Sequence, residues 1–411
     1  CGKSAVQHEL EAIELKMENV DLEQQVRARA EEWMKAPFDA ETQAAVRELV
    51  EAGGEPLTEA FYTELEFGTG GLRGVMGVGT NRMNAYTVGQ ASQGLARYLL
   101  SQIPAAEAAI AIAHDSRLNS PEFARVAAEV FAAHGIKAYL YDGLRPTPQL
   151  SFTVRELGCT AGIVLTASHN PKEYNGYKVY WADGGQIVPP QDAGIIAEVR
   201  GVALTEIQRA PDSELIVPIG AELDAAFEQY VLGLRLDADL IANGSDLKLV
   251  YTPLHGTGAV SVTPALRAAG FRNVAVVPEQ AEPDGNFPTV HSPNPEEGAA
   301  LEAAIALAQS TGAQLVLGTD PDSDRVGIAV RQSDGAFRLL NGNETGALLV
   351  DYVLRGLASA GQMPKHPFVA KTIVTSELMA EIARHRGIEV VETLTGFKWI
   401  AAAIREREGQ S

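Results

Sequence analysis

Cysteine is scarce in this chain, and its scarcity excludes two kinds of architecture. Only two of the 411 residues are cysteine, Cys1 and Cys159. Two thiols are too few for a disulfide framework or a thiolate metal cluster, and such usage favours a reducing compartment. We therefore expect a cytoplasmic protein. Cys159 leads into an apolar stretch, which predicts a small buried residue rather than a catalytic thiol.

Positive charge and long apolar runs are also in short supply. The sequence has 33 Lys and Arg against 53 Asp and Glu, a net charge of −20. Binding to nucleic acid or to anionic lipid requires clustered basic residues, and no apolar run is long enough to span a membrane. We expect neither partner. A phosphorylated small molecule stays possible, because a few local cations, a metal and backbone N–H groups suffice to bind it.

What is present is an ordinary globular composition, 46% apolar and 21% charged, in a chain long enough for two or three domains. Helical spacing, including Leu10 to Met17, predicts a helical extension over residues 1–60. Strand–loop–helix alternation then predicts an α/β domain over 61–212, with residues 211–217 as a linker. A second domain is expected over 213–335 and part of a third over 336–411.

The most informative segment runs from Thr166 to Lys178. An apolar strand leads directly to Ser168, a position typical of functional loops in α/β proteins. A serine hydroxyl needs a base, a metal or prior activation to act as a nucleophile. Asn175-Gly176 predicts a turn, and a hairpin-like return would bring Lys178 beside Ser168, where it can move a proton on a substrate hydroxyl. The alternative is a polar turn without chemistry.

His169 follows the serine, so a Ser–His pair has to be considered. Adjacent side chains rarely point in the right directions for such a pair. We therefore expect His169 to support the loop or to contact phosphate.

A second loop, Asp320 to Arg325, carries carboxylates at alternate positions: Asp320, Asp322 and Asp324. In an extended loop this spacing puts all three on one side. Three hard oxygen donors suit Mg²⁺. A calcium EF-hand fails, because its sixth and twelfth positions would be Arg325 and Arg331 rather than Gly and Glu. An acidic surface turn is the alternative, although Arg325 beside the cluster favours phosphate recognition.

Four further cations could face an anionic ligand, although each, taken alone, is more often a solvated surface charge: Arg73, Arg117, Lys371 and Lys398. Arg73 lies in a glycine-rich segment, Phe67 to Gly74, whose glycines allow close backbone approach or simply form turns. The loop His255 to Gly258 has no clear assignment beyond a structural turn.

Taken together, these segments resemble the α-D-phosphohexomutase superfamily, most closely its phosphoglucomutase and phosphopentomutase branch. Thr166 to Pro171 resembles the phosphoserine loop, and Asp320 to Arg325 the magnesium loop. Phe67 to Gly74 resembles the N-terminal substrate loop, and Thr395 to Lys398 the third-domain loop near the sugar. The resemblance implies tandem α/β domains with mixed sheets sandwiched by helices.

The resemblance also implies a mechanism. Ser168 would carry a phosphoryl group and share Mg²⁺ with the three aspartates. A sugar phosphate would accept this group and become a bound sugar 1,6-bisphosphate, which would then return its other phosphate to Ser168. The same sugar 1,6-bisphosphate would also be the activator of the enzyme. Catalytic residues would be Ser168, Lys178, His169, Arg73 and Arg325. The expected substrate contacts are Arg73, Asn170, Lys371, Thr395, Gly396 and Lys398. The partner is a phosphosugar, hexose or pentose, and the protein a monomer or homodimer.

The chain departs from the superfamily pattern at both ends. We expect two complete domains and part of a third, with the fourth domain and its phosphate clamp absent. Cys1 in place of Met is expected to mark a trimmed or mis-started N-terminus. Glu344 is not assigned the role of the family's sugar-binding glutamate, because it follows the aspartate loop too closely. Lost substrate contacts should raise KM and slow turnover.

Two other functions remain as alternatives. The first is a non-catalytic remnant that binds phosphosugar and magnesium. The second is a magnesium-dependent phosphatase with Asp320 as its nucleophile. The phosphatase hypothesis would leave the Ser168 loop unexplained. In addition, the loop from Asp320 to Asp324 lacks the threonine that is usual in the haloacid dehalogenase pattern.

Overall fold

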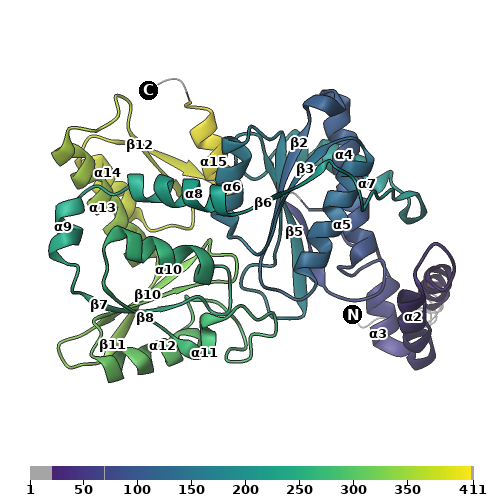
Figure 1. Cartoon of the computed structure of the whole chain (residues 1–411), viewed down its shortest axis with the longest axis horizontal. Coiled ribbons are helices and arrows are strands. Elements are labelled where there is room, and N and C mark those ends of the chain that lie inside the picture. The colour runs from purple at the N-terminus through teal and green to yellow at the C-terminus, as the bar shows by residue number, and fades with distance from the viewer. Residues whose placement is uncertain (1–20, 69, 409–411) are drawn as a thin grey trace, which may run out of the picture.

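The structure, a computed structural model, describes residues 21–68 and 70–408. It contains three α/β units, one at the right of Figure 1, one at the lower left and one at the upper left. Within the described ranges, no helix combines the length and apolar character needed to cross a membrane.

The first unit is built on a six-stranded mixed sheet of order β1-β5-β4-β2-β3-β6. Its strands are β1 (Gly71–Val75), β2 (Ala109–His114), β3 (Lys137–Tyr141), β4 (Ala161–Leu165), β5 (Tyr174–Trp181) and β6 (Ile216–Ile219). Its helices are α4 (Ala85–Gln102), α5 (Ser120–Ala133), α6 (Thr147–Glu156), α7 (Gln191–Arg200) and α8 (Ala221–Gly233), with short 3-10 turns η1 (Ala105–Glu107) and η2 (Leu204–Glu206).

Helices cover both faces of this sheet. The larger core joins the sheet to α4, α5 and α7, and a smaller one joins its other face to α6 and α8. Every residue of β4 is buried, as expected of a central strand with both faces covered. This rigid centre delivers the loop that follows β4 to the carboxyl edge of the sheet.

The second unit has a five-stranded sheet of order β11-β10-β9-β7-β8. Its strands are β7 (Lys248–Thr252), β8 (Asn273–Val276), β9 (Leu315–Thr319), β10 (Val326–Arg331) and β11 (Phe337–Leu340). Its helices are α9 (Ala238–Asn243), α10 (Gly258–Ala269), α11 (Pro278–Ala281) and α12 (Gly298–Thr311). The small side chains of α12, including Ala304 and Ala308, pack on Val250 and Val316 of the sheet.

The third unit contains two parallel strands, β12 (Phe368–Thr372) and β13 (Glu389–Thr393). Its helices are α13 (Gly342–Ala360), α14 (Glu377–His385) and α15 (Phe397–Arg405). Asn341 caps α13 in a capping box with Glu344, so Glu344 belongs to a helix start, as its position in the sequence predicted. The three units thus confirm the predicted tandem α/β fold.

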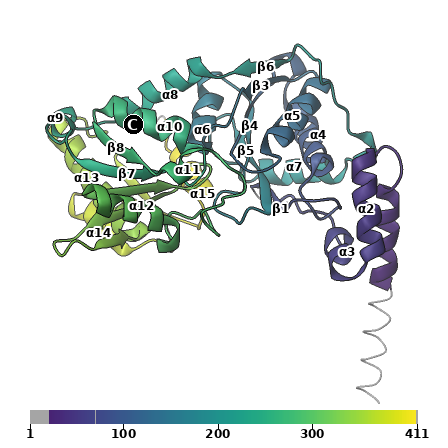
Figure 2. The same cartoon turned by 60° about the horizontal axis from the view of Figure 1, so that its bottom comes forward.

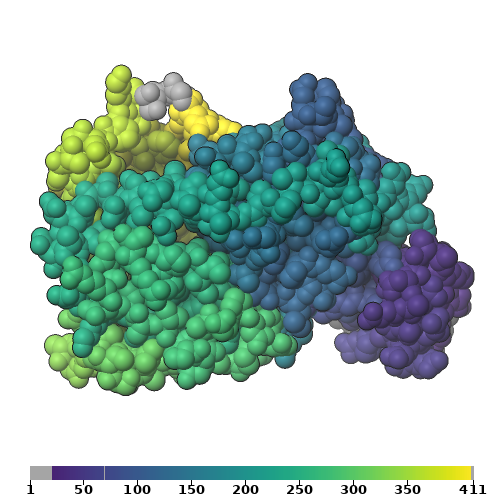
Figure 3. Space-filling model, in the orientation of Figure 1, coloured from purple at the N-terminus to yellow at the C-terminus, as the bar shows by residue number. Residues whose placement is uncertain are grey.

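Residues 21–61 form a helical lobe at the edge of the first unit, purple in Figures 2 and 3. Its helices are residues 21–33, α2 (Ala40–Ala52) and α3 (Gly54–Phe61). Trp33 stacks on Phe38 with 4.4 Å between ring centroids. Tyr86 of α4 joins this cluster and bonds Asp39, which fixes the lobe to the first unit. The predicted helical spacing at Leu10 to Met17 and the residue Cys1 lie outside the described residues.

Two local predictions were wrong. Asn175-Gly176 is not a turn but the start of β5, because Gly176 pairs with Arg73 of β1. The expected linker over 211–217 includes the first residues of β6, which pairs with β3 at the edge of the first sheet. In the glycine-rich segment, the second half is strand β1, and Gly71 allows close backbone approach, since a Cβ there would lie 1.7 Å from the Tyr177 carbonyl oxygen. The domain limits themselves stay predictions.

Candidate active site

The serine loop connects two central strands of the first sheet. β4 and β5 are antiparallel, and Val164 lies opposite Lys178. The hairpin-like return is therefore present, with its bend before Asn175 rather than after it. Ser168 is buried and has a φ of 53°, and its N–H donates to the Thr166 hydroxyl at 2.8 Å. This left-handed backbone is costly for a residue with a side chain, and such strain gathers at functional sites.

Arg117 holds the serine loop from inside. The sequence offered it as a cation for an anionic ligand or as a surface charge, and both interpretations are wrong, because Arg117 is 1% exposed. Its guanidinium donates to the carbonyl oxygens of Ser168, Asn170, Pro171 and Tyr174 at 2.5–3.0 Å. The Arg117 Nε lies 3.3 Å from Asp115 Oδ2. Arg117 therefore shapes the loop instead of facing the solvent.

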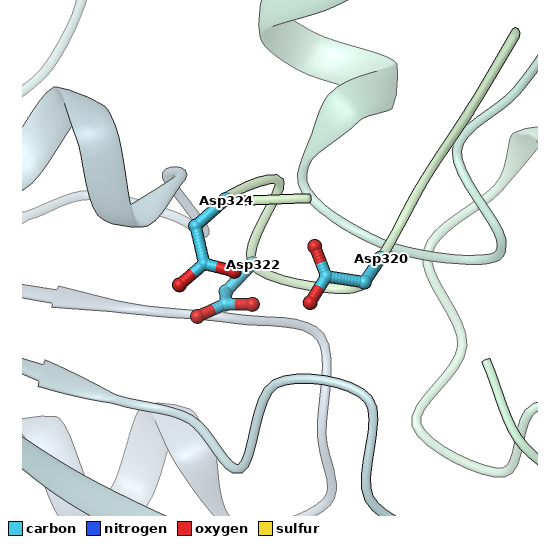
Figure 4. A group of neighbouring side chains, drawn as sticks. All are labelled: Asp320, Asp322 and Asp324. Carbon is cyan, nitrogen blue, oxygen red and sulfur yellow. The ribbon is translucent and has the colours of Figure 1, made fainter. Parts of the chain in front are cut away.

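The aspartate loop brings its carboxylates together by turning. The Ser323 N–H donates to the Asp320 carbonyl at 2.9 Å, and Ser323 has a φ of 53°. The predicted extended backbone is thus replaced by a turn, but the predicted convergence holds. Oxygens of Asp320, Asp322 and Asp324 all lie within 4.8 Å of one another, and Figure 4 shows Asp320 facing the other two carboxylates.

The two loops meet across the first and second units. Ser168 Oγ donates to Asp320 Oδ2 at 2.7 Å. Lys178 Nζ donates to Asp322 Oδ2 at 2.7 Å and to Asp324 Oδ2 at 3.1 Å. Residues about 150 positions apart in the sequence therefore form one hydrogen-bonded cluster around the serine hydroxyl.

Charge is unevenly distributed over this cluster. Burial, reinforced by the charges of Asp322 and Asp324, raises the pKa of Asp320 well above its ordinary value. Burial would also raise the pKa of Asp322, but the charge of Lys178 and the hydrogen bonds from Lys178 and Thr147 together hold that pKa low. Burial alone would lower the pKa of Lys178, and the two carboxylates overcome it and raise the pKa. Lys178 is therefore an ammonium group in this arrangement.

The cluster fits a hard divalent cation. Asp322 Oδ1 is buried and has no hydrogen-bond partner among the described residues, and a buried oxygen of this kind needs a ligand to offset its desolvation. Burial and, after it, the charges of Asp322 and Asp324 raise the pKa of Asp320, and a bound cation would offset both effects. The three aspartates and Ser168 Oγ supply oxygen donors only, the set that magnesium-type ions prefer.

His169 lies closer to the serine than the sequence argument expected. Its Nδ1 is 3.2 Å from Ser168 Oγ, next to the left-handed backbone at Ser168. Burial, with a smaller contribution from the charge of Arg325, lowers the pKa of His169.

A cavity of about 1160 Å³ opens beside the cluster. Several predicted site residues line it together: Arg73, Ser168, His169, Lys178, Asp324, Arg325 and Gly396. Its wall thus combines the first unit with the aspartate loop of the second and the start of α15 in the third. The lining also includes an aromatic pair, Phe152 and Tyr230, whose ring centroids are 5.3 Å apart.

Other predicted substrate contacts lie away from this cavity. Asn170, Lys371, Thr395 and Lys398 are not among the described residues that line it. Lys371 is buried and bonded to Glu377 and Glu392 at 2.7 and 2.8 Å. Lys398 lies over the Trp399 ring at 5.2 Å. Their part in substrate binding stays a prediction.

Two threonines that sequence reasoning did not select hold the aspartate loop. Thr147 donates its hydroxyl to Asp322 Oδ2, and Thr257 donates to the Pro321 carbonyl. Thr257 lies in the loop His255 to Gly258, and Thr147 is the first residue of α6. Only the fold shows that these two segments converge on the aspartates.

Comparison with known proteins gives consistent similarities. Family models described as phosphoglucomutase/phosphomannomutase α/β/α domains I, II and III match residues 64–205, 228–335 and 341–410.

A probable phosphoribomutase of Schizosaccharomyces pombe is 39% identical over 391 residues, covering 92% of this chain and 66% of that protein. A phosphoglucomutase of Staphylococcus haemolyticus is 41% identical over 351 residues, covering 85% of this chain and 63% of that protein. The chain thus spans less than two thirds of the length of these relatives.

A solved structure agrees with these sequence matches. A putative phosphomannomutase from Thermus thermophilus is 28% identical to this chain, with a TM-score of 0.69. The match covers 84% of this chain and 72% of the other.

Proposed function

Because the chain belongs to the phosphoglucomutase/phosphomannomutase family of the α-D-phosphohexomutase superfamily, we propose that it carries the phosphoryl-transfer centre of a phosphosugar mutase. The reaction moves a phosphoryl group between C1 and C6 of a hexose, or between C1 and C5 of a pentose. Phosphoglucomutase is the first choice, since relatives of that name are 39–41% identical to this chain.

One observation carries the proposal: the Ser168 hydroxyl lies 2.7 Å from Asp320 at the wall of a large cavity. In the proposed cycle Ser168 carries the phosphoryl group. A sugar hydroxyl forms the new P–O bond as the bond to Ser168 Oγ breaks, and the proton of that hydroxyl passes to Ser168 Oγ. The resulting sugar bisphosphate reorients, and its other phosphate returns to Ser168 by the reverse exchange.

We assign the proton transfer to Lys178: as an ammonium group it gives a proton to Ser168 Oγ as the bond to phosphorus breaks, and it then takes the proton of the sugar hydroxyl. It approaches the serine loop from the neighbouring strand and is the cation in contact with Asp322 and Asp324. Arg73 and Arg325 line the cavity and can stabilise charge on the phosphoryl oxygens during transfer. His169 would contact the same oxygens from beside Ser168.

Mg²⁺ is the ion that we propose for the aspartate cluster, held by Asp320, Asp322, Asp324 and the oxygen of Ser168. When bound, it would supply positive charge to the phosphoryl group. The same proposal includes a sugar 1,6-bisphosphate as activator and a cytoplasmic setting, which the free buried thiol of Cys159 suits.

The test compares the chain with Ser168→Ala. Incubation with Mg²⁺, a trace of glucose 1,6-bisphosphate and either glucose 1-phosphate or ribose 1-phosphate is followed by phosphorus NMR. The proposal predicts loss of isomerisation in Ser168→Ala. Full isomerisation in that variant would exclude Ser168 as the phosphoryl carrier. Release of inorganic phosphate by both proteins, without isomerisation, would favour a phosphatase that uses Asp320. Magnesium and ligand binding without isomerisation in the unsubstituted chain would favour a non-catalytic remnant.

A further inference from the structure

The first residue of α6, in the first unit, contacts the aspartate loop of the second unit. Thr147 is 5% exposed and makes two hydrogen bonds to one residue there. Its N–H donates to the Asp322 carbonyl at 2.9 Å. Its hydroxyl donates to Asp322 Oδ2 at 2.8 Å. Thr147 therefore forms hydrogen bonds with both the backbone and the side chain of Asp322.

The position of Thr147 in its helix explains why these donors are available. It is the first residue of α6, after Pro146. The first N–H groups of a helix have no partner within the helix, so that of Thr147 can reach across to the loop. The positive end of the helix dipole also favours a carboxylate at this position.

Because of these bonds, the two oxygens of Asp322 are not equivalent. Oδ2 accepts from Thr147 at 2.8 Å and from Lys178 at 2.7 Å. Oδ1 is buried and has no hydrogen-bond partner among the described residues. The two hydrogen bonds to Oδ2 fix the rotation of the carboxylate. They leave Oδ1 as the oxygen that is free to bind a metal ion.

We propose that Thr147 is a positioning residue for a divalent cation, fixing Asp322 so that Oδ1 faces the ion. The inference rests on the proposed function only in taking the aspartate cluster as a metal centre. A residue that orients a ligand in this way commonly contributes about 10–100-fold to metal affinity.

The support behind Thr147 is rigid. Leu150 and Val154 of α6 are fully buried in the core against the first sheet. Beside Thr147 in the sequence, Arg145 and Gln149 donate to Asp224 of α8 at 2.6–2.7 Å. None of these groups has a described hydrogen bond to the aspartate loop, so the start of α6 can act as a fixed point for that loop.

Thr257 provides the matched comparison. Its N–H and hydroxyl donate to the Pro321 carbonyl at 2.8 and 2.9 Å. It therefore supports the same loop through the backbone, next to Asp322, but donates no described hydrogen bond to a carboxylate. Thr257→Val removes a hydroxyl from the loop's support without releasing the Asp322 side chain.

The experiment measures the Kd for Mn²⁺, added alone, by electron paramagnetic resonance of the free ion. Melting temperatures are recorded for every variant. Thr147→Val is expected to weaken Mn²⁺ binding about 10–100-fold. Thr147→Ser, which keeps the hydroxyl, and Thr257→Val are expected to stay within about threefold of the unsubstituted chain. Thr147→Ala replaces Thr147→Val if the valine variant does not fold.

Three outcomes would overturn the proposal. A Thr147→Val protein that binds Mn²⁺ as tightly as the unsubstituted chain would show that Asp322 needs no such support. An equal loss in Thr257→Val would assign the effect to loop stiffness instead. If the unsubstituted chain binds no Mn²⁺, the metal centre of the proposed function fails as well, which separates that failure from the first two.

Discussion

Replacing Arg117 by methionine should destabilise the first unit severely, although Arg117 bears no assigned chemistry. Methionine keeps much of the volume and removes the charge. Asp115 is fully buried beside Arg117. Removing one partner of a buried ion pair costs about 3–5 kcal/mol, because the other charge is left uncompensated. Four loop carbonyls lose their shared donor at the same time.

This cost corresponds to a fall in melting temperature of about 6–20 °C, at about 2–4 °C per kcal/mol. Differential scanning calorimetry measures it. Burial already raises the pKa of Asp115 against the opposing charge of Arg117, so adding Asp115→Asn to Arg117→Met should recover part of the loss. The double variant isolates the contribution of the stranded charge.

Arg125→Met is the matched control. Arg125 is 60% exposed and pairs with Glu129 at 3.0 Å, while Glu129 keeps a second partner, Arg209. Exposed pairs contribute about 0–1 kcal/mol, so this variant should melt within a few degrees of the unsubstituted chain. Equal melting temperatures for Arg117→Met and Arg125→Met would refute the claim that the buried Arg117 stabilises the first unit.

Three further predictions concern other parts of the chain. Burial raises the pKa of Cys159 to about 12, so iodoacetamide at pH 8 should label it only after denaturation; rapid labelling of the native protein would contradict this. Gly256→Ala should weaken Mn²⁺ binding, because the new Cβ would lie 2.4 Å from Pro321 Cα and displace the aspartate loop; an unchanged Kd would show that the loop yields freely. Trp33→Ala should lower the free energy of unfolding by about 3–5 kcal/mol, because it leaves a cavity in the core around Phe38, but it should leave the Kd for Mn²⁺ unchanged. Calorimetry and metal titration can check these two results.

The sequence was sufficient to select the serine loop and the aspartate loop as candidate site segments, because the signals for both are local. Ser168 follows one apolar strand, and the three aspartates follow another. The apolar pattern of these strands and the position of the polar residues directly after them were enough to predict the two loops. The pairing of β4 with β5 then confirmed that Lys178 returns toward the serine loop. Such features depend on neighbours in the chain, which a sequence displays directly.

The supporting residues were not predictable in the same way. Arg117 looked like any surface cation, and only its burial under the serine loop shows that four carbonyls occupy it. Thr147 and Asp322 are 175 positions apart, so no local pattern connects them. The turn assigned to Asn175-Gly176 failed because pairing with β1 outweighs the local turn preference of these residues.

The central claim is that Ser168 accepts and carries a phosphoryl group, and mass spectrometry tests it directly. The chain is incubated with Mg²⁺ and glucose 1,6-bisphosphate, then measured intact and by peptide mapping, with Ser168→Ala in parallel. The account predicts one added phosphoryl group, on the peptide containing Ser168, and none in the variant. A folded, metal-bound chain that gains no phosphoryl group, or gains it elsewhere, would contradict the account.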